Sequence, residues 1–159
     1  MNSPKQHGFS LVELLIVVTL IGILSAIAIP NFLAARRAAN EGSAQSSLRT
    51  IHSCEAAYHA TVGLGEYTDL PTLAVYTLTD SVLGSGTKSG YSFAVHPTAN
   101  GVRPALFYST AVPISASGPA RTGSRRFGMT EDGILHGDAT SSAPYADHDE
   151  VVDADPIRN

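Results

Sequence analysis

The pattern of apolar and polar residues divides the chain into three stretches, and the first is the most distinctive. From Phe9 to Ile29 the sequence is almost continuously apolar, and Glu13 is the one ionisable side chain within it. About 20 apolar residues in a helix span the roughly 30 Å hydrocarbon core of a bilayer. The run therefore predicts a membrane-spanning helix over residues 9–30. We expect the helix to begin at Phe9 and to continue to about Thr61.

Two residues predict a weak point inside this helix. Pro30 removes a backbone donor and clashes with the carbonyl four residues earlier, and Gly22 costs about 1 kcal/mol relative to Ala in a helix interior. The segment from Gly22 to Pro30 is therefore where we expect the helix to bend or unwind. For an isolated chain, a simple kink at Pro30 is the favoured form.

The second stretch, residues 31–62, is Ala-rich and polar, and it predicts an amphipathic continuation of the same helix. Apolar residues recur on one stripe at helical spacing, although Glu55 falls on that stripe too. These residues are Ala44, Leu48, Ile51, Tyr58 and Val62. One side of this half should pack on a domain, and the glycines in the sequence Gly-Leu-Gly at 63–65 should end the helix.

The third stretch, residues 63–159, predicts a small antiparallel sheet that packs on the amphipathic half of the helix. Residues 66–90 are expected to form a short helix or an irregular loop. Alternating or apolar runs bounded by Gly and Pro predict the strands, and Asp-Gly at 132–133 predicts a hairpin turn. The expected strands cover residues 91–96, 105–112, 124–130 and 134–136. The chain is thus expected to be an α+β protein.

The end of this stretch, residues 137–159, is poor in apolar residues and rich in carboxylates. Such a composition favours a solvated, partly mobile acidic tail. A calcium site is the alternative, because calcium takes six to eight oxygen ligands. The acidic residues are Asp138, Asp147, Asp149, Glu150, Asp153 and Asp155, and their spacing fits no EF-hand loop. No metal and no cofactor are therefore expected.

The chain's composition narrows the remaining chemistry. The single cysteine, Cys54, excludes an intramolecular disulfide and is expected to be a small buried hydrophobe, with an intersubunit bridge as the alternative. No nucleophile elbow or phosphate loop is present, so we expect no enzyme activity. His52 and His59 are seven residues apart and are expected to lie on the surface.

The net charge of −4 argues against general nucleic-acid binding. Arg121, Arg125 and Arg126 nevertheless form a local basic patch, which leaves DNA binding as a minor alternative.

Glu13 is the exception in the apolar run. A carboxylate inside a membrane helix costs about 2.5–3.5 kcal/mol and is a functional candidate by default. We expect Glu13 to await a positive partner that arrives on assembly. The alternative is that its carboxylate reaches the membrane surface.

Gly8-Phe9, followed by Glu13 and preceded by a short polar leader, resembles the prepilin signal of type IV pilins and of type II secretion pseudopilins. Gly22 and Pro30 also stand where those helices carry a glycine and a proline. The resemblance implies that a prepilin peptidase removes residues 1–8 by cleavage between Gly8 and Phe9 and that Phe9 is then N-methylated. It assigns Glu13 to assembly and Gly22 and Pro30 to bending or unwinding.

The resemblance also implies a type IV pilin fold and a structural subunit that polymerises through its N-terminal helix into a filament for adhesion, motility or DNA uptake. Its partners would be other copies of itself, the prepilin peptidase and an inner-membrane assembly platform with a cytoplasmic ATPase motor. The chain would reside in the inner membrane before assembly and at the cell surface afterwards.

Two other functions remain open: a pseudopilin of a type II secretion system, and a binding module for which the helix is a plain membrane tether. Major pseudopilins share a Pro/Trp/Asn-rich segment after the helix, whereas this chain contains no Trp. A plain tether does not require Gly8-Phe9, Glu13 and Pro30 together. A pilin is therefore the favoured interpretation.

Overall fold

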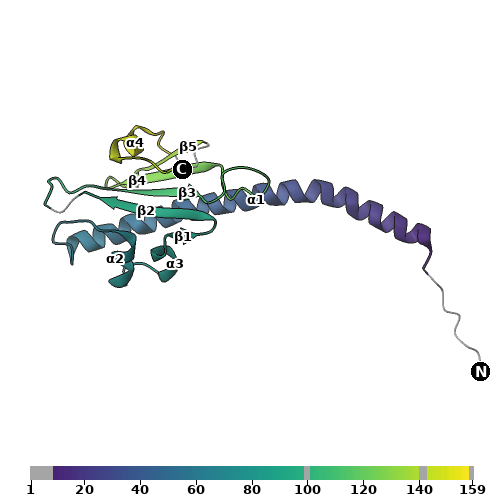
Figure 1. Cartoon of the computed structure of the whole chain (residues 1–159), viewed down its shortest axis with the longest axis horizontal. Coiled ribbons are helices and arrows are strands. Elements are labelled where there is room, and N and C mark those ends of the chain that lie inside the picture. The colour runs from purple at the N-terminus through teal and green to yellow at the C-terminus, as the bar shows by residue number, and fades with distance from the viewer. Residues whose placement is uncertain (1–8, 99–100, 140–142, 158–159) are drawn as a thin grey trace, which may run out of the picture. The chain divides into compact units, whose positions relative to one another are not determined.

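The computed structural model describes residues 9–98, 101–139 and 143–157. The chain forms two compact units, Met1–Ala35 and Arg36–Asn159, and helix α1 (Leu11–Ala60) supplies residues to both. The other helices are α2 (Leu70–Val75), α3 (Ser81–Gly84) and α4 (His148–Asp153), as labelled in Figure 1. The strands are β1 (Thr87–Lys88), β2 (Tyr91–Pro97), β3 (Phe107–Pro113), β4 (Arg125–Thr130) and β5 (Leu135–Ala139).

The predicted long helix is confirmed as α1, which begins at Leu11 rather than Phe9 and ends at Ala60 rather than Thr61. Its apolar part lies in the first unit. Its first backbone hydrogen bond runs from the Leu14 N–H to the Ser10 carbonyl, at 3.1 Å. The Thr19 hydroxyl donates to the Leu15 carbonyl at 2.7 Å, which satisfies that polar group inside the apolar run. By length and composition, α1 could cross a membrane.

In the second unit, five strands form one antiparallel sheet in chain order, β1-β2-β3-β4-β5. The predicted α+β class is confirmed. The register pairs Phe93 with Ala111 and Ala111 with Phe127, so these inward-facing side chains form a row across three strands. Sequence patterning did not predict β1, because a two-residue strand is too short to show alternation. The predicted helix or loop between residues 66 and 90 forms α2 and α3.

The core lies between this sheet and residues 36–60 of α1. Ala44, Leu48 and Ile51 of the predicted stripe are buried there, as expected. Their partners on the sheet are Tyr91, Phe93, Val95, Phe107, Ala111, Phe127, Met129 and Leu135. The end of the stripe differs from expectation, because Tyr58 is half-buried and Val62, beyond the helix, is exposed. Cys54 is buried as expected, and its thiol donates to the Leu78 carbonyl at 2.9 Å.

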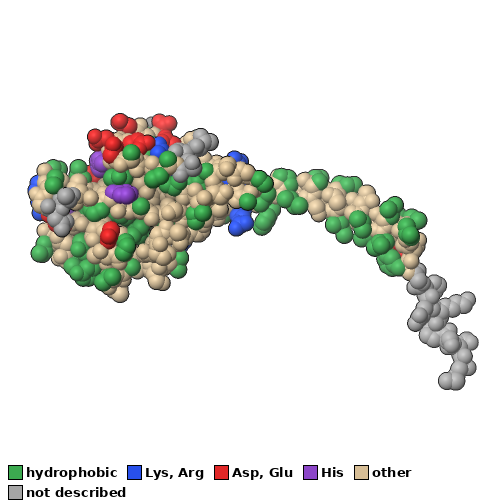
Figure 2. Space-filling model, viewed as in Figure 1, with side chains coloured by type: hydrophobic (Ala, Val, Ile, Leu, Met, Phe, Trp, Pro, Cys, Tyr) green, Lys and Arg blue, Asp and Glu red, His purple; other side chains and the backbone are tan. Residues whose placement is uncertain are grey.

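The C-terminal segment corrects the prediction of a solvated tail. Over residues 143–157 the chain packs on the sheet, with Tyr145 and Val151 buried. Gly128 of β4 makes room for it, since an added Cβ would lie 2.8 Å from a methyl group of Val151. The carboxylates still lie mostly outward, and Figure 2 shows acidic side chains gathered over α4. Residues 140–142 and 158–159 of the predicted tail lie outside the described residues.

After α4 the chain returns to the edge of the sheet. The Gly137 N–H donates to the Asp155 carbonyl at 3.1 Å, and the Ile157 N–H donates to the Leu135 carbonyl at 2.8 Å. Composition alone did not reveal this packing, because a buried Tyr and Val separated by acidic residues give no periodic signal.

Candidate functional site

The outer surface of the first unit is apolar over most of its length. Nearly all large apolar side chains of α1 from Leu11 to Phe32 are exposed, and no residue in the most apolar 18-residue window is buried. The apolar side chains of this helix are visible in Figure 2. An exposed apolar surface of this extent marks contact with a membrane or with other proteins.

The predicted functional residues of this unit lie on α1 or directly before it. Phe9 precedes the helix and is 73% exposed, whereas Gly8 lies outside the described residues. Glu13 is in the first turn of α1, where the aligned peptide dipoles favour a negative charge. Its carboxylate takes part in none of the ion pairs found among the described residues. The structure thus brings no cation to Glu13 within the described part of one chain.

Gly22 and Pro30 lie inside α1, which runs through both positions as helix. A Cβ added to Gly22 would meet no atom within 4 Å. The glycine is therefore not required for packing within the chain, and its effect on helix propensity can be tested separately. Bending or unwinding at these residues stays a prediction.

The predicted basic patch in the second unit is wrong for Arg126, because Arg126 is buried. Its guanidinium donates to Asp138 at 2.7 Å and to Glu150 at 2.8 Å, and it lies 3.8 Å from the centre of the Tyr145 ring. It also donates to the Pro144 carbonyl at 3.3 Å. Arg126 therefore binds the C-terminal segment and does not offer its charge to DNA.

Glu150 completes this cluster. Its carboxylate also accepts a hydrogen bond from the Ala146 N–H at 2.6 Å. This bond and the bond from Arg126 hold the pKa of Glu150 below its usual range. Sequence reasoning missed the cluster, because its partners come from segments 12 and 24 residues away from Arg126.

A second buried ionisable group, Glu55, faces the segment that follows α1. Its side chain is fully buried, one carboxylate oxygen accepts the Thr68 N–H at 3.0 Å, and the other has no hydrogen-bond partner. Burial raises the pKa of Glu55 to about 7; the Thr68 bond opposes the shift and Asp69 adds to it. The only sequence signal was that Glu55 falls on the apolar stripe.

The histidines correct another prediction, since His52 and His59 are half-buried. A ring nitrogen of His52 lies 3.2 Å from the Glu131 carbonyl oxygen, and His59 stacks on Tyr67 at 4.7 Å between ring centres. His148 lies 3.1 Å from the Glu131 carboxylate. Among the described residues, no group of three or more His, Cys, Asp or Glu could hold a metal ion. The alternative of a calcium site therefore gains no support there.

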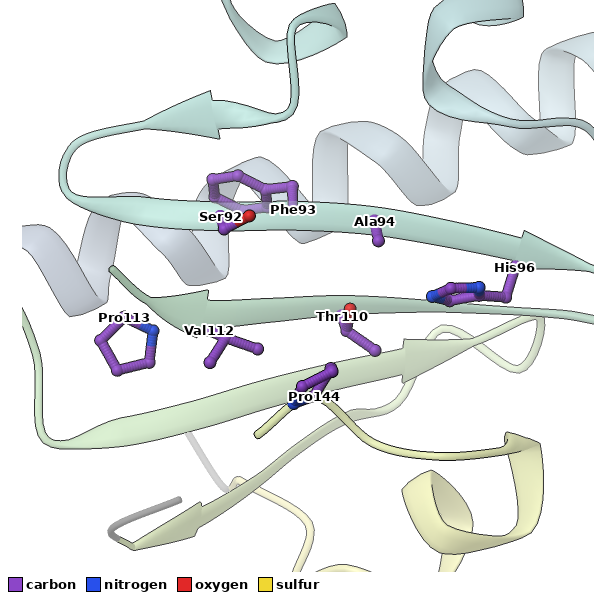
Figure 3. Close-up of a pocket in the computed structure, with 8 residues that line it drawn as sticks. All are labelled: Ser92, Phe93, Ala94, His96, Thr110, Val112, Pro113 and Pro144. Carbon is purple, nitrogen blue, oxygen red and sulfur yellow. The ribbon is translucent and has the colours of Figure 1, made fainter. Parts of the chain in front are cut away.

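The outer face of the sheet carries an open cavity of about 340 Å³. Figure 3 shows it over β2 and β3, with His96 and Thr110 on the strands and Pro144 from the C-terminal segment near Thr110. The described residues that line this cavity include no set of catalytic side chains.

Comparisons with known proteins agree with the N-terminal motif. Residues 3–29 match the family model described as the prokaryotic N-terminal methylation motif. The chain is 39% identical over 56 residues, 35% of its length, to the type IV major pilin protein PilA of Myxococcus xanthus. It is 62% identical over 37 residues, 23% of its length, to the type IV wide pilus major component PilA4 of Thermus thermophilus. The matches span 26% and 28% of those two relatives, and no solved structure matches the chain.

The apolar N-terminal helix and the antiparallel sheet define a class of α+β proteins with a helix able to enter a membrane. The methylation motif and the two pilin relatives make this more specific. Over its N-terminal segment, the chain is thus similar to proteins of the type IV pilin family.

Proposed function

We propose that this chain is a structural subunit of a type IV pilus and polymerises through its N-terminal helix into a filament. The observation that carries the proposal is the exposed apolar surface of α1 within a segment that matches the N-terminal methylation motif. The two relatives are named as major pilus components, which favours a pilin over a secretion pseudopilin. The filament would serve adhesion, motility or DNA uptake.

The subunit passes through two environments in this proposal. It first lies in the inner membrane, where the apolar helix is solvated by lipid, and it then joins a filament at the cell surface. Because such a helix does not leave lipid unaided, export requires an assembly platform driven by a cytoplasmic ATPase. In the filament, other copies of the chain cover the apolar surface. This sequence of steps gives the exposed side chains of α1 a partner at each stage.

Processing prepares the helix for assembly. A prepilin peptidase cleaves between Gly8 and Phe9, and the new amine on Phe9 is then methylated. Gly8 suits cleavage because it lets another backbone approach closely. Methylation keeps the nitrogen basic, so Phe9 carries a positive charge at neutral pH. The mature chain then has a cation at its first residue and the Glu13 carboxylate one helical turn later.

Glu13 sets the register of each incoming subunit. Its carboxylate pairs with the Phe9 amine of a subunit already in the filament, which fixes the axial position of the new helix. The attraction itself contributes little, because desolvation offsets much of it. A helix in the wrong register leaves a buried charge without a partner, which costs about 3–5 kcal/mol. The apolar side chains around Glu13 give adhesion with little preference for register.

Gly22 and Pro30 allow the helix to change between these environments. In lipid, every backbone polar group must be satisfied within the segment, which favours the helix. In a filament, neighbouring chains and water can satisfy those groups, and the segment from Gly22 to Pro30 unwinds and lengthens the subunit. A filament map with continuous helix from Phe9 to Thr61 would exclude this step.

Two measurements on the native source test the proposal. Mass spectrometry of the exported chain should give a mature protein that begins at methylated Phe9. Labelling with an antibody against the second unit should decorate long surface filaments. A mature chain that begins at Met1 contradicts the pilin function, and a processed chain confined to the cell envelope favours the secretion pseudopilin.

A further inference from the structure

The segment between α1 and the sheet, residues 63–80, is held to the helix around one buried carboxyl group. Tyr76 lies 5.7 Å from Tyr58 between ring centres, and the Leu78 carbonyl accepts the Cys54 thiol. Between these two contacts along α1 lies Glu55, which accepts the Thr68 N–H at 3.0 Å. We propose that Glu55 is a proton-controlled lock, which holds residues 63–80 against α1 when neutral and loosens them when ionised.

The first argument is the shortage of partners for a charged Glu55. A buried carboxylate normally binds a cation or accepts several hydrogen bonds. Glu55 has one donor, the Thr68 N–H, and its other oxygen is buried without a partner. None of the ion pairs among the described residues includes it. The site therefore suits a neutral carboxyl group better than a carboxylate.

The second argument is the charge of the surrounding elements. Asp69, at the start of α2, raises the pKa of Glu55, and Asp80, before α3, acts on the adjoining Cys54 in the same sense. The neighbouring titratable side chains of α1 are His52, Cys54, Tyr58 and His59, and those of the following segment are Glu66, Tyr67 and Tyr76. From the sheet side, Glu131 raises the pKa of Tyr67. Arg103 pairs with Glu66 at 2.9 Å. Ionisation of Glu55 thus adds a negative charge to a mostly acidic region.

The direction of the effect follows from the two protonation states. The pKa of Glu55 is about 7 when buried, against an ordinary value of 4.5. The stability that its neutral form gives is therefore complete below about pH 4.5 and declines as the pH rises to about 7. Above about pH 7, no further stability is lost through Glu55. Near neutral pH, a small change in pH therefore alters how firmly α2 is held, together with the exposed Val75 and Tyr76.

The test compares Glu55→Gln with the wild-type full-length chain in detergent micelles. Gln keeps the size of the side chain and an oxygen for the Thr68 N–H, but it cannot ionise. Hydrogen exchange of residues 63–80 is measured at about pH 5.5 and about pH 8.5, and each rate is divided by its intrinsic rate. The wild-type opening equilibrium should rise by about 30-fold between the two conditions, whereas that of Glu55→Gln should stay nearly constant.

A control variant and an NMR titration test the proposed role of Glu55 further. Glu41→Gln is the matched control, since Glu41 lies on the same helix and also accepts a backbone N–H, from Ser124 at 2.8 Å. It should retain the wild-type pH dependence in residues 63–80. A carbon-13 NMR titration of the wild-type chain should place the Glu55 carboxyl transition near pH 7. A transition near 4.5, or equal pH dependence in wild type and Glu55→Gln, would overturn the lock, and neither result depends on filament formation.

Discussion

The two halves of α1 share one secondary structure but bury their apolar side chains by different means. Residues 36–60 turn one stripe inward, and Leu48 and Ile51 are fully buried by the sheet of the same chain. Residues 11–35 are apolar on nearly all sides, and most of them are exposed. A helix with one apolar stripe is completed by its own domain, whereas a helix that is apolar all round requires lipid or other proteins. Periodicity, rather than total hydrophobicity, thus distinguishes the two halves.

Each half also carries a carboxylate that forms no ion pair among the residues that the structure describes. Glu55 is buried in the domain and accepts one backbone hydrogen bond, so its environment favours the neutral form. Glu13 lies in an exposed first turn, where a later partner can reach it. The same residue type therefore serves two roles in our proposals: Glu13 acts between chains, and Glu55 acts within one chain.

The largest effect is expected from Glu13→Ala. Without the carboxylate, the Phe9 amine of the neighbouring subunit has no partner, and filament abundance should fall by at least about tenfold. Cleavage and membrane insertion should remain nearly intact. Glu13→Gln should fail similarly, because it keeps the size of the side chain and loses the charge. Filaments would be counted by electron microscopy, and processing would be followed by mass spectrometry.

Val12→Ala is the matched control for this experiment, since it alters an exposed neighbour in the same turn without removing a charge. It should assemble at near wild-type abundance. Normal filaments in Glu13→Ala would mean that helix packing alone sets the register.

Two leucine substitutions, one in each half of α1, should differ in their effect on the free energy of unfolding of the second unit. Leu48→Ala removes a fully buried side chain and should lower the free energy of unfolding of the second unit by about 3 kcal/mol. Leu24→Ala alters an exposed side chain and should change it by less than about 0.5 kcal/mol. Tyrosine fluorescence during denaturation of the full chain reports the unfolding of the second unit, because all six Tyr lie between residues 58 and 145. Equal effects would show that the two halves unfold as one unit.

The smallest effect is expected from a pair of glycines. Gly22 and Gly42 both lie in α1, and a Cβ added to either would meet no atom within 4 Å. Replacement by Ala should favour the helix by about 1 kcal/mol at each site. Only Gly42→Ala should raise the free energy of unfolding of the second unit, while Gly22→Ala should slow hydrogen exchange near residues 18–30. A gain in the second unit from Gly22→Ala would contradict the independence of the two halves.

Much of the fold could be predicted from the sequence because its signals are local. The apolar run, the stripe through Leu48 and Ile51, and the alternation after Tyr91 each appear within a few turns or one strand. The helix and four of the five strands followed from these patterns. The C-terminal segment did not, because Tyr145 and Val151 pack on Gly128 through contacts that no local pattern encodes.

The predicted site residues also differ in whether their signal is local in the sequence. Gly8, Phe9 and Glu13 lie within six residues of one another, inside the range 3–29 that matches the N-terminal methylation motif. The partners of Arg126 and the burial of Glu55 depend on residues brought together by folding. Arg126 was therefore mistaken for part of a basic surface patch. The one sequence feature that indicated burial of Glu55 was its position on the apolar stripe.

The edges of the sheet have a consequence for the filament that we propose. Unpaired strand edges are templates for cross-β aggregation, and natural sheets shorten, charge or cover them. One edge strand here, β1, has two residues and includes Lys88. At the other edge, β5 is bonded to the returning chain at Asp155 and Ile157. In the filament that we propose, neighbouring domains would therefore meet blunted edges, which would direct association to the helix and away from amyloid-like fusion of sheets.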